Sequence, residues 1–249
     1  MSDTTTDGFL GGQINIEQPR NGFRSGIDAV LLAAAVPAKS GESVLELGCG
    51  AGAASLCLAA RVPGLELTGV EISPEMAELA KLNAARNGVD MKIVEADVSD
   101  MPDEIRKLNF DHVFLNPPYF RQGTVSPPNG AAKAVAHAET ETGLTAWIDA
   151  AYKRLKPKGR LTVIQKAERF ADLLSALDDR LGDITLKPIA PRKGKPAELV
   201  ILSARKGAKG APRLLAPLIL HKGKAHRTDG DDYRAEVGRM LRRGEALVL

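Results

Sequence analysis

The chain has 249 residues, of which 44% are hydrophobic and 26% charged, proportions that are ordinary for a globular protein with one large domain. No apolar run is long enough to span a membrane, and the polar, acidic residues 1–7 are not a signal peptide, so we expect a cytoplasmic protein. The net charge is only +3, but residues 187–243 hold 15 basic and 5 acidic residues, a local net charge of +10. This asymmetry is as compatible with a surface for a polyanion as with an ordinary solvated surface.

The first 36 residues predict an arm followed by a helix. Residues 1–7 are expected to be disordered, and Gly8 to Gly26, rich in glycine with alternating apolar residues, predict a short hairpin or arm. The apolar run from Ile27 to Val36 predicts a helix that stops at Pro37, with Asp28 in the first turn, where a negative charge is favourable. We divide the chain into an arm and helix at 1–36, a core at 37–206 and a basic extension at 207–249 that packs on the core.

A glycine-rich turn follows the first strand of the core. The segment from Ser43 to Gly52 predicts a strand, a tight turn and the start of a helix, whose free N–H groups favour a negative group of a ligand. The spacing Gly48-x-Gly50-x-Gly52 differs from the Gly-x-Gly-x-x-Gly pattern of nicotinamide sites. Glu46, just before the turn, suits a cationic ligand better than a pyrophosphate.

Two more acidic residues follow predicted strands. Glu71 ends the next strand, 23 residues beyond Gly48, and its carboxylate can accept hydrogen bonds from both hydroxyls of a ribose. Ser73 and Pro74 predict the start of a helix that reaches Arg86, with Ser73 as the N-cap. Asp97 follows a short third strand.

A fourth strand, beginning at Asp111, stops abruptly at Asn116, because two successive prolines cannot continue a strand ladder. The side-chain oxygen of Asn116 and the carbonyl of Pro117 are hydrogen-bond acceptors that can hold the two hydrogens of an exocyclic amine. Tyr119 can stack on the planar group that carries the amine. A strand that simply ends in a proline-rich turn is the alternative interpretation.

The second half of the chain predicts further α/β elements and a basic tail. The irregular stretch from Phe120 to Gly143 is typical of a substrate lid. After it we expect helices at 145–155 and 168–179, a strand at 160–165, an antiparallel pair at 183–189 and 198–204, and a tail helix at 232–243. The loop that joins the antiparallel pair carries Arg192, Lys193 and Lys195, which can contact phosphates.

The glycine turn, Glu71 and Asn-Pro-Pro-Tyr, in this order, resemble the motifs of class I S-adenosylmethionine-dependent methyltransferases that act on amines. With the arm at 22–32 and the tail, the chain resembles the bacterial tRNA adenine-N6 methyltransferases that modify A37 of valine tRNA. The resemblance implies an α/β, Rossmann-like fold with a seven-stranded mixed sheet, helices on both faces, a short N-terminal arm and a C-terminal extension. It also implies S-adenosylmethionine as the cofactor and tRNA as the partner, with no metal.

The resemblance assigns roles to individual residues. The cofactor-binding residues it implies are Arg24, Ser25, Glu46, Gly48, Cys49, Gly50, Gly52, Glu71, Ile72, Asp97, Val98 and Asn116. The implied catalytic residues are Asn116, Pro117, Pro118 and Tyr119, and Tyr119 and Phe120 are the implied substrate-binding residues. To the substrate-binding set we add Arg192, Lys193 and Lys195, on the charge of their loop alone. Three alternatives remain open: N5-methylation of a glutamine in a release factor, N-methylation of an rRNA base, and a cofactor- or RNA-binding module without catalysis.

Overall fold

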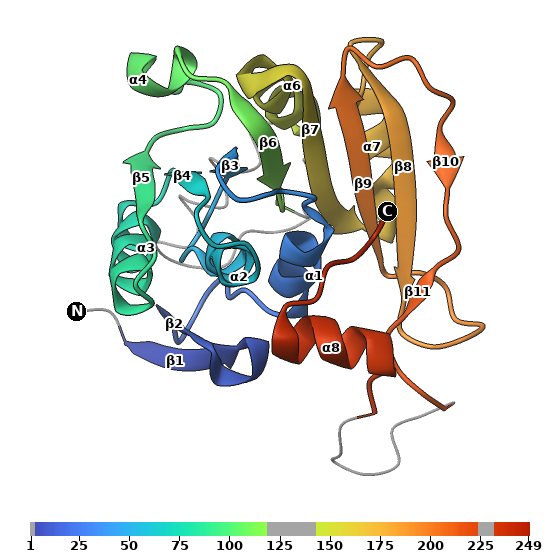
Figure 1. Ribbon diagram of the computed structural model, residues 1–249, viewed down its shortest axis with the longest axis horizontal. Coiled ribbons are helices and arrows are strands. Elements are labelled where there is room, and N and C mark those ends of the chain that lie inside the picture. The colour runs from blue at the N-terminus through green and yellow to red at the C-terminus, as the bar shows by residue number, and fades with distance from the viewer. Residues whose placement is uncertain (1–2, 119–142, 224–231) are drawn as a thin grey trace.

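The structure, a computed structural model, describes residues 3–118, 143–223 and 232–249. A mixed sheet forms its centre, with the strands in the order β10-β8-β9-β7-β6-β3-β4-β5 and with β11 paired to β8 (Figure 1). The main strands are β3 (Ser43–Leu47), β4 (Glu66–Glu71), β5 (Met91–Glu95), β6 (Phe110–Leu115), β7 (Leu155–Lys166), β8 (Leu181–Ala190) and β9 (Leu199–Lys206). The helices are α1 (Ile27–Ala35), α2 (Ala53–Arg61), α3 (Pro74–Arg86), α4 (Asp103–Arg106), α6 (Leu144–Arg154), α7 (Phe170–Ala176) and α8 (Ala235–Arg243). Only β9 runs antiparallel to its neighbours in this sheet, which confirms the predicted mixed sheet.

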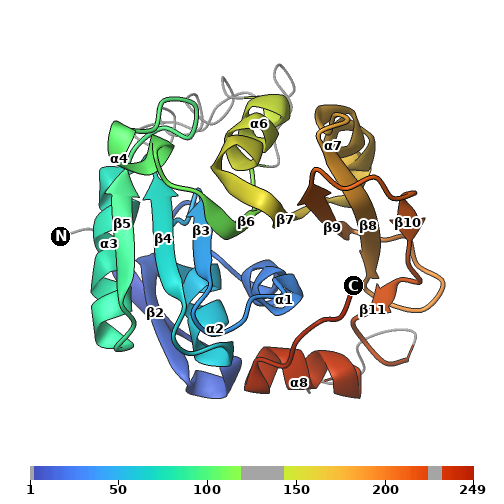
Figure 2. The ribbon, with the colours of Figure 1, turned by 45° about the horizontal axis from the view of Figure 1, so that its top comes forward.

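Helices cover both faces of the sheet, because successive side chains of each buried strand point to opposite sides. Val44 and Phe114 face α1, α2 and α3, in a core that also contains residues of the arm and of α8. Leu45 and Leu115 face α4, α6 and α7. Figure 2 shows α6 and α7 on one side of the sheet and α1, α2 and α8 on the other. The predicted fold class is confirmed.

Several local predictions hold because their signals are local. The α3 helix spans the predicted residues, and Ser73 caps it by accepting a hydrogen bond from the Met76 N–H at 3.4 Å. Pro74 occupies the first turn, and Gly88, with φ +64°, follows the helix end. These residues fix the position of the helix that follows Glu71.

Three expectations need correction. Disorder over residues 1–7 is wrong for the described part, because β1 (Thr4–Phe9) pairs antiparallel with β2 (Ile14–Pro19). The helix expected at 168–179 is shorter, a 3-10 turn (η2, Ala167–Arg169) followed by α7. The sheet has nine strands instead of seven, because the tail adds β10 (Arg213–Leu214) and β11 (Leu218–Ile219) along β8.

The C-terminal extension is part of the packed core. Val237 and Met240 of α8 and Leu247 after it are buried in the core around α1. The Leu247 N–H donates to the Ala34 carbonyl at 2.8 Å, and the Gln13 side chain, next to the 3-10 turn η1 (Leu10–Gly12), donates to the Arg242 carbonyl at 2.9 Å. The extension therefore holds the arm and α1 together. Within the described residues, no helix is long and apolar enough to cross a membrane.

Strand direction places the predicted site residues at one edge. β3, β4, β6 and β8 are mutually parallel, so the segments after Leu47, Glu71, Leu115 and Ala190 leave the sheet at the same edge. In such sheets ligands bind outside the carboxyl ends of the strands. β8 is three strand spacings from β6, about 14 Å at 4.8 Å per strand.

Candidate active site

The glycine turn after β3 is held close to the end of β4. The N–H groups of Gly48 and Cys49 both donate to the Val70 carbonyl, at 2.8 and 3.0 Å. Gly48, Gly50 and Gly52 have φ values of +68°, +54° and +85°, which side chains rarely adopt. This turn therefore needs glycine for its backbone shape as well as for approach of a ligand.

Cys49 packs into the sheet and does not face a ligand with its side chain. It is 3% exposed, and a Cβ built on Gly69 of β4 would be 2.7 Å from the Cys49 Sγ. Burial raises the pKa of the thiol well above its ordinary value. Only the backbone of Cys49 is then available for the predicted cofactor role, and the thiol is inert.

Glu71 is a structural part of the turn. Its carboxylate accepts hydrogen bonds from the N–H of Gly50 at 2.7 Å and from the N–H of Ser73 at 2.9 Å. Burial raises its pKa above the ordinary value, and the N–H groups of Ser73 and Gly50 act in the opposite direction. Because each oxygen keeps a lone pair, both can still accept a hydroxyl.

Glu46 lies below the turn at 3% exposure, where the backbone N–H and Oγ of Ser55 donate to it. Burial raises its pKa to about 8, against the effect of Ser55. In the free protein it is therefore mostly protonated at pH 7, which refines the expectation of a fixed negative charge.

Asp97 lies after β5, with its Oδ1 accepting from the N–H and Oγ of Ser99, both at 2.7 Å. Val98 is buried and Ile72 half-buried beside the same strand ends. Since the carboxyl ends of β3, β4 and β5 lie next to one another, the structure brings the glycine turn, Glu71 and Asp97 together.

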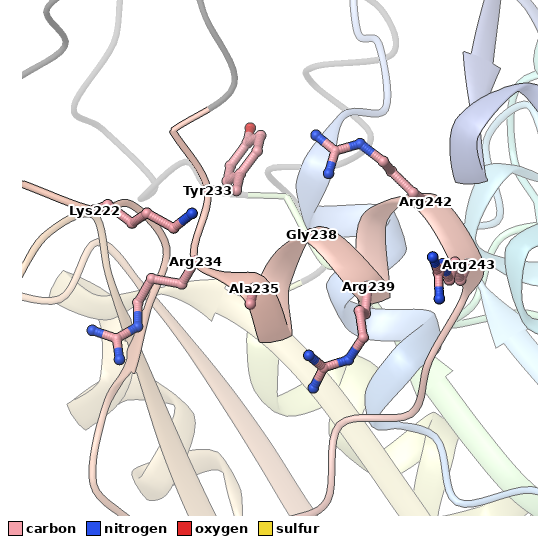
Figure 3. A pocket seen from close by; sticks show the side chains of 8 residues that line it. All are labelled: Lys222, Tyr233, Arg234, Ala235, Gly238, Arg239, Arg242 and Arg243. Carbon is pink, nitrogen blue, oxygen red and sulfur yellow. The ribbon is translucent and has the colours of Figure 1, made fainter.

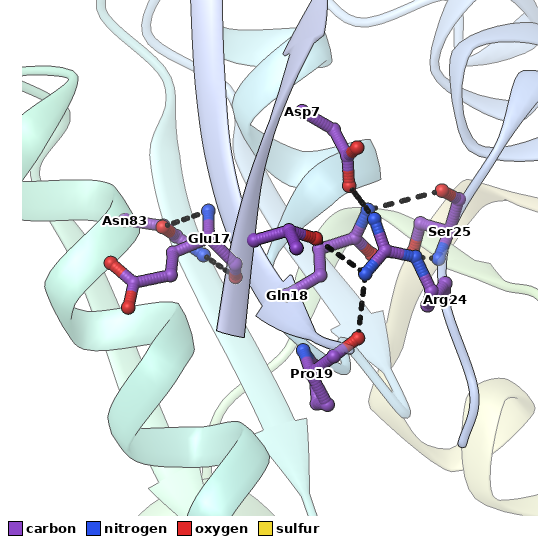
Figure 4. A network of polar contacts seen from close by, with 8 residues as sticks. Asp7, Glu17, Gln18, Pro19, Arg24, Ser25 and Asn83 are labelled. Carbon is purple, nitrogen blue, oxygen red and sulfur yellow. Dashed lines mark hydrogen bonds and ion pairs between the residues drawn. The ribbon is translucent and has the colours of Figure 1, made fainter. Parts of the chain in front are cut away.

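The arm is fastened by its own polar network (Figure 4). Arg24 donates to Thr5 and to the Pro19 carbonyl, both at 2.7 Å, and forms an ion pair with Asp7. The Ser25 N–H donates to Gln18 at 2.8 Å. Three N–H groups of the Arg24 guanidinium are thus used within the hairpin, and its contact with the cofactor remains a prediction.

Two arm contacts were not foreseen. Phe23 is 58% exposed and lies beside the glycine turn, 4.0 Å from a Cβ built on Gly50. Asn83 of α3, fully buried, accepts from the Glu17 N–H at 2.8 Å and donates to the carbonyls of Glu17 and Ala51, both at 2.9 Å. Asn83 thereby joins β2 of the arm to the glycine turn.

Asn116 is held from one side. Its Nδ2 donates to the Asp28 carboxylate at 2.8 Å, and its Oδ1 is buried without a hydrogen-bond partner among the described residues. Asp28 belongs to the first turn of α1, and sequence reasoning assigned it only to the helix dipole. A buried, unpaired acceptor is uncommon, so this oxygen is a candidate to accept a hydrogen bond from a ligand.

The backbone after Asn116 is held from the other side. Gln165 at the end of β7, fully buried, donates to the carbonyls of Pro117 and Pro118 at 3.3 and 3.5 Å, and Arg169 donates to Pro118 at 3.4 Å. Gln165 was not among the predicted site residues, because nothing in its local sequence pattern connects it with residue 117. Tyr119, Phe120 and the expected lid, apart from Gly143, lie outside the described residues.

The predicted phosphate contacts divide into two kinds. Arg192 is buried, pairs with Asp232, and donates to the carbonyl of Lys222. The expectation that it faces solvent and contacts phosphates is therefore wrong. Lys193 and Lys195 are exposed. Arg192 could not be recognised as internal because Asp232 is 40 positions further along the chain.

A basic pocket of about 250 Å³ lies beside this loop, on α8 and the turn before it (Figure 3). It is lined by Lys222, Tyr233, Arg234, Ala235, Gly238, Arg239, Arg242 and Arg243. Tyr233 stacks on His221 with the ring centroids 4.6 Å apart. Within residues 3–118, 143–223 and 232–249, no group of three His, Cys, Asp or Glu side chains could hold a metal.

The chain is similar in sequence to known proteins. The family model for the methyltransferase small domain matches residues 25–188. A tRNA1(Val) (adenine(37)-N6)-methyltransferase of Porphyromonas gingivalis is 33% identical over 176 residues, which are 68% of each chain. The enzyme of the same name from Dickeya chrysanthemi is 32% identical over 219 residues, 85% of this chain and 84% of its own.

Solved structures of methyltransferases have a similar fold. A predicted O-methyltransferase from Agrobacterium tumefaciens is 29% identical, with a TM-score of 0.67 over 89% of this chain and 99% of that one. The 16S rRNA N2 G1207 methyltransferase of Thermus thermophilus, in complex with AdoMet and guanosine, shares the fold at 22% identity, with a TM-score of 0.56 over 82% of this chain and 50% of that one.

The strand order, the glycine turn and the acidic strand ends define a class I methyltransferase that uses S-adenosylmethionine. The chain belongs to the methyltransferase small domain family.

The residues at the strand ends fit this cofactor. The flank of Gly50 is open, with the nearest atoms to a built Cβ at 3.6 and 4.0 Å, and the lone pairs of Glu71 suit ribose hydroxyls. Glu46 can give up its proton beside a cation. The exposed ring of Phe23 offers an apolar surface next to the same turn.

Proposed function

We propose that the protein methylates N6 of an adenine in tRNA, with position 37 of valine tRNA as the first candidate and the cytoplasm as its expected location. The observation that carries the proposal is the unpaired Oδ1 of Asn116 beside the Pro117 carbonyl, at the carboxyl edge of the sheet. Two relatives above 30% identity, which this chain matches over 68% or more of their length, bear the name of that activity.

The two acceptors suit an amine. An exocyclic NH2 has two hydrogens, and Asn116 Oδ1 and the Pro117 carbonyl accept one each. The Gln165 donor uses one lone pair of the Pro117 carbonyl and leaves the second for the substrate. Accepting both hydrogens concentrates electron density on the nitrogen as the new bond forms, so the contacts strengthen in the transition state.

The cofactor supplies a methyl group already activated on a cationic sulfur. The chain therefore has to position the amine and needs no strong base, since the proton is acidic once the methyl is attached. The Agrobacterium tumefaciens structure is named a predicted O-methyltransferase. A hydroxyl acceptor would offer one hydrogen and would leave one of the two acceptors unpaired. This difference supports an amine over a hydroxyl. Stacking of the base on Tyr119 and Phe120 remains part of the proposal.

The basic surface supports a nucleic acid. Exposed Lys193 and Lys195 follow the end of β8, at the same edge as Asn116. The basic pocket around Lys222 and Arg239 adds positive charge on α8 and the turn before it. The separation of about 14 Å between β8 and β6 is shorter than one turn of an RNA duplex, so phosphates of a stem can lie there while one base reaches Asn116.

The test is transfer of tritiated methyl from labelled S-adenosylmethionine onto separate fractions of tRNA, rRNA and release factors. Digestion to nucleosides then identifies the modified base. The proposal expects label in tRNA as N6-methyladenosine. Label confined to a release factor or to rRNA would reject it.

A further inference from the structure

Asp28 connects the arm helix with the catalytic strand end. Its Oδ1 accepts from the Gly26 N–H at 3.1 Å, at the start of α1, and its Oδ2 accepts from Asn116 Nδ2 at 2.8 Å. The two residues are 88 positions apart in the chain. One carboxylate therefore shapes the helix start and contacts the candidate catalytic amide.

The direction of this hydrogen bond decides whether the oxygen or the NH2 group of the Asn116 side chain faces the substrate. The two ends of an amide are nearly equal in shape but opposite in hydrogen bonding. A carboxylate only accepts, so the NH2 group of Asn116 must face Asp28 and the oxygen must face away from it. That oxygen is the buried atom without a partner among the described residues.

We propose that Asp28 is a positioning residue that fixes the amide of Asn116 with its oxygen toward the substrate amine. The inference rests on the proposed function, because the donor that completes the Asn116 oxygen is the amine. A flipped amide would present its NH2 to the amine, two donors facing each other, and could not hold it. The Asp28 carboxylate makes the flipped state unfavourable, since the Asn116 oxygen would then face a negative charge.

The experiment is a double-mutant cycle with Asp28→Asn, Asn116→Asp and the two combined, measured as single-turnover methyl transfer to tRNA. In Asp28→Asn, the amide oxygen keeps accepting from the Gly26 N–H, so the NH2 group faces Asn116 and favours the flipped orientation of Asn116. We expect its rate to fall by about 10- to 100-fold, the scale for losing one oriented donor or acceptor at a reacting group, while the cofactor Kd stays within about twofold.

The combined variant restores the hydrogen bond with reversed polarity. The amide introduced at position 28 would donate to one oxygen of the carboxylate introduced at position 116, whose other oxygen would accept from the amine. We expect the combined variant to transfer methyl at least tenfold faster than Asp28→Asn. A role of Asp28 in the helix start alone predicts no such rescue, because Asn116→Asp does not touch that helix start.

The controls separate the possible failures. Glu75 is also an acidic residue in a helix first turn, that of α3, so Glu75→Gln measures the effect of losing such a charge, and we expect wild-type rates. Wild-type protein that methylates no amine rejects the proposed function. If the wild type is active, Asn116→Ala is inactive and Asp28→Asn is unimpaired, the role of Asp28 is rejected and the proposed function stands. The role of Asp28 is also rejected if the combined variant is no faster than Asp28→Asn although the two have equal melting temperatures.

Discussion

The ring of Trp147, on α6, occupies the space into which a side chain on Gly48 would extend. A Cβ built on Gly48 would be 2.8 Å from Cη2 and 3.0 Å from Cζ3 of the indole. Gly48 also has φ +68°, where a side chain is strained. The first glycine of the turn is therefore required because Trp147 packs against it, in addition to any requirement of the cofactor.

Replacing Gly48 with Ala should cost more stability than the same change at Gly50. Gly48→Ala combines left-handed strain with overpacking against Trp147, about 2–4 kcal/mol of unfolding free energy. Gly50, with φ +54°, has its nearest neighbour at 3.6 Å and should cost about 1 kcal/mol through strain alone. Urea unfolding measures both, and Trp147→Leu should recover part of the loss in Gly48→Ala. Equal losses at the two glycines would contradict the packing role of Trp147.

Cofactor binding should release protons from Glu46. The pKa of Glu46 in the free protein is about 8, so most molecules carry the proton at pH 7, and a cation beside the carboxyl favours its loss. We expect release of most of one proton, and an affinity that rises as the pH passes through 8. Calorimetry at pH 7 in buffers of different ionisation enthalpy counts the protons. An equal count for Glu46→Gln would contradict this assignment.

The same carboxyl should make stability depend on pH. Its folded pKa of about 8 is above its ordinary 4.5, so its contribution to stability is fully present below pH 4.5 and is lost as the pH rises through 8. Glu46→Gln cannot ionise, so its unfolding free energy relative to wild type should increase between those values. Parallel pH profiles for the two proteins would show that Glu46 ionises normally.

Asn83 should hold the arm against the glycine turn. Asn83→Ala leaves three backbone groups without their partner, two of Glu17 and one of Ala51, and we expect a loss of about 2–3 kcal/mol in stability. Cofactor affinity should fall as well, because the arm carries Phe23 beside Gly50. Asn87→Ala is the matched control, since Asn87 bonds Asn15 of the same strand but largely in solvent. A larger loss for Asn87→Ala would contradict this account.

Lys193 and Lys195 should act on RNA, and Arg192 on the fold. Charge reversal of both lysines should weaken tRNA binding and reduce its salt slope by up to about one unit for each phosphate that is no longer neutralised, with the melting temperature unchanged. Arg192→Met should instead lower the melting temperature by several degrees, because Asp232 and the Lys222 carbonyl lose their bonds to the buried guanidinium. The measurement is a titration of tRNA at several salt concentrations. Superimposable curves for wild type and the lysine variant would show that Lys193 and Lys195 do not contact phosphates.

What the sequence could predict was set by how local the signal is. The Ser73 cap, the Pro74 start and the break at Asn116 depend on adjacent residues, and each lies where its pattern predicts. The strand alternation separates Val44 from Leu45 in the same way. These features are enough to define the order of the elements and hence the class of fold.

What could not be predicted depends on distant partners. Asp28 meets Asn116, Gln165 meets Pro117 and Arg192 meets Asp232 only after the sheet has formed, and no local pattern marks any of these pairs. Disorder was expected for Thr4 to Asp7 because they are polar, yet they pair with β2. A polar strand at an arm is stabilised by its ladder and by hydrogen bonds such as that of Arg24 with Thr5, which composition does not reveal.

The most direct test of the account is single-turnover methylation of a valine tRNA transcript by wild type and Asn116→Ala, with adenine or inosine at position 37. Inosine lacks the exocyclic amine. We expect N6-methyladenosine only with wild type and adenine 37. We also expect a near-normal cofactor Kd for Asn116→Ala, because the Asn116 oxygen accepts from the amine, so that the cofactor-binding role implied for Asn116 by the resemblance contributes little to affinity. Equal rates for wild type and Asn116→Ala, or equal labelling of the inosine transcript, would contradict the central claim.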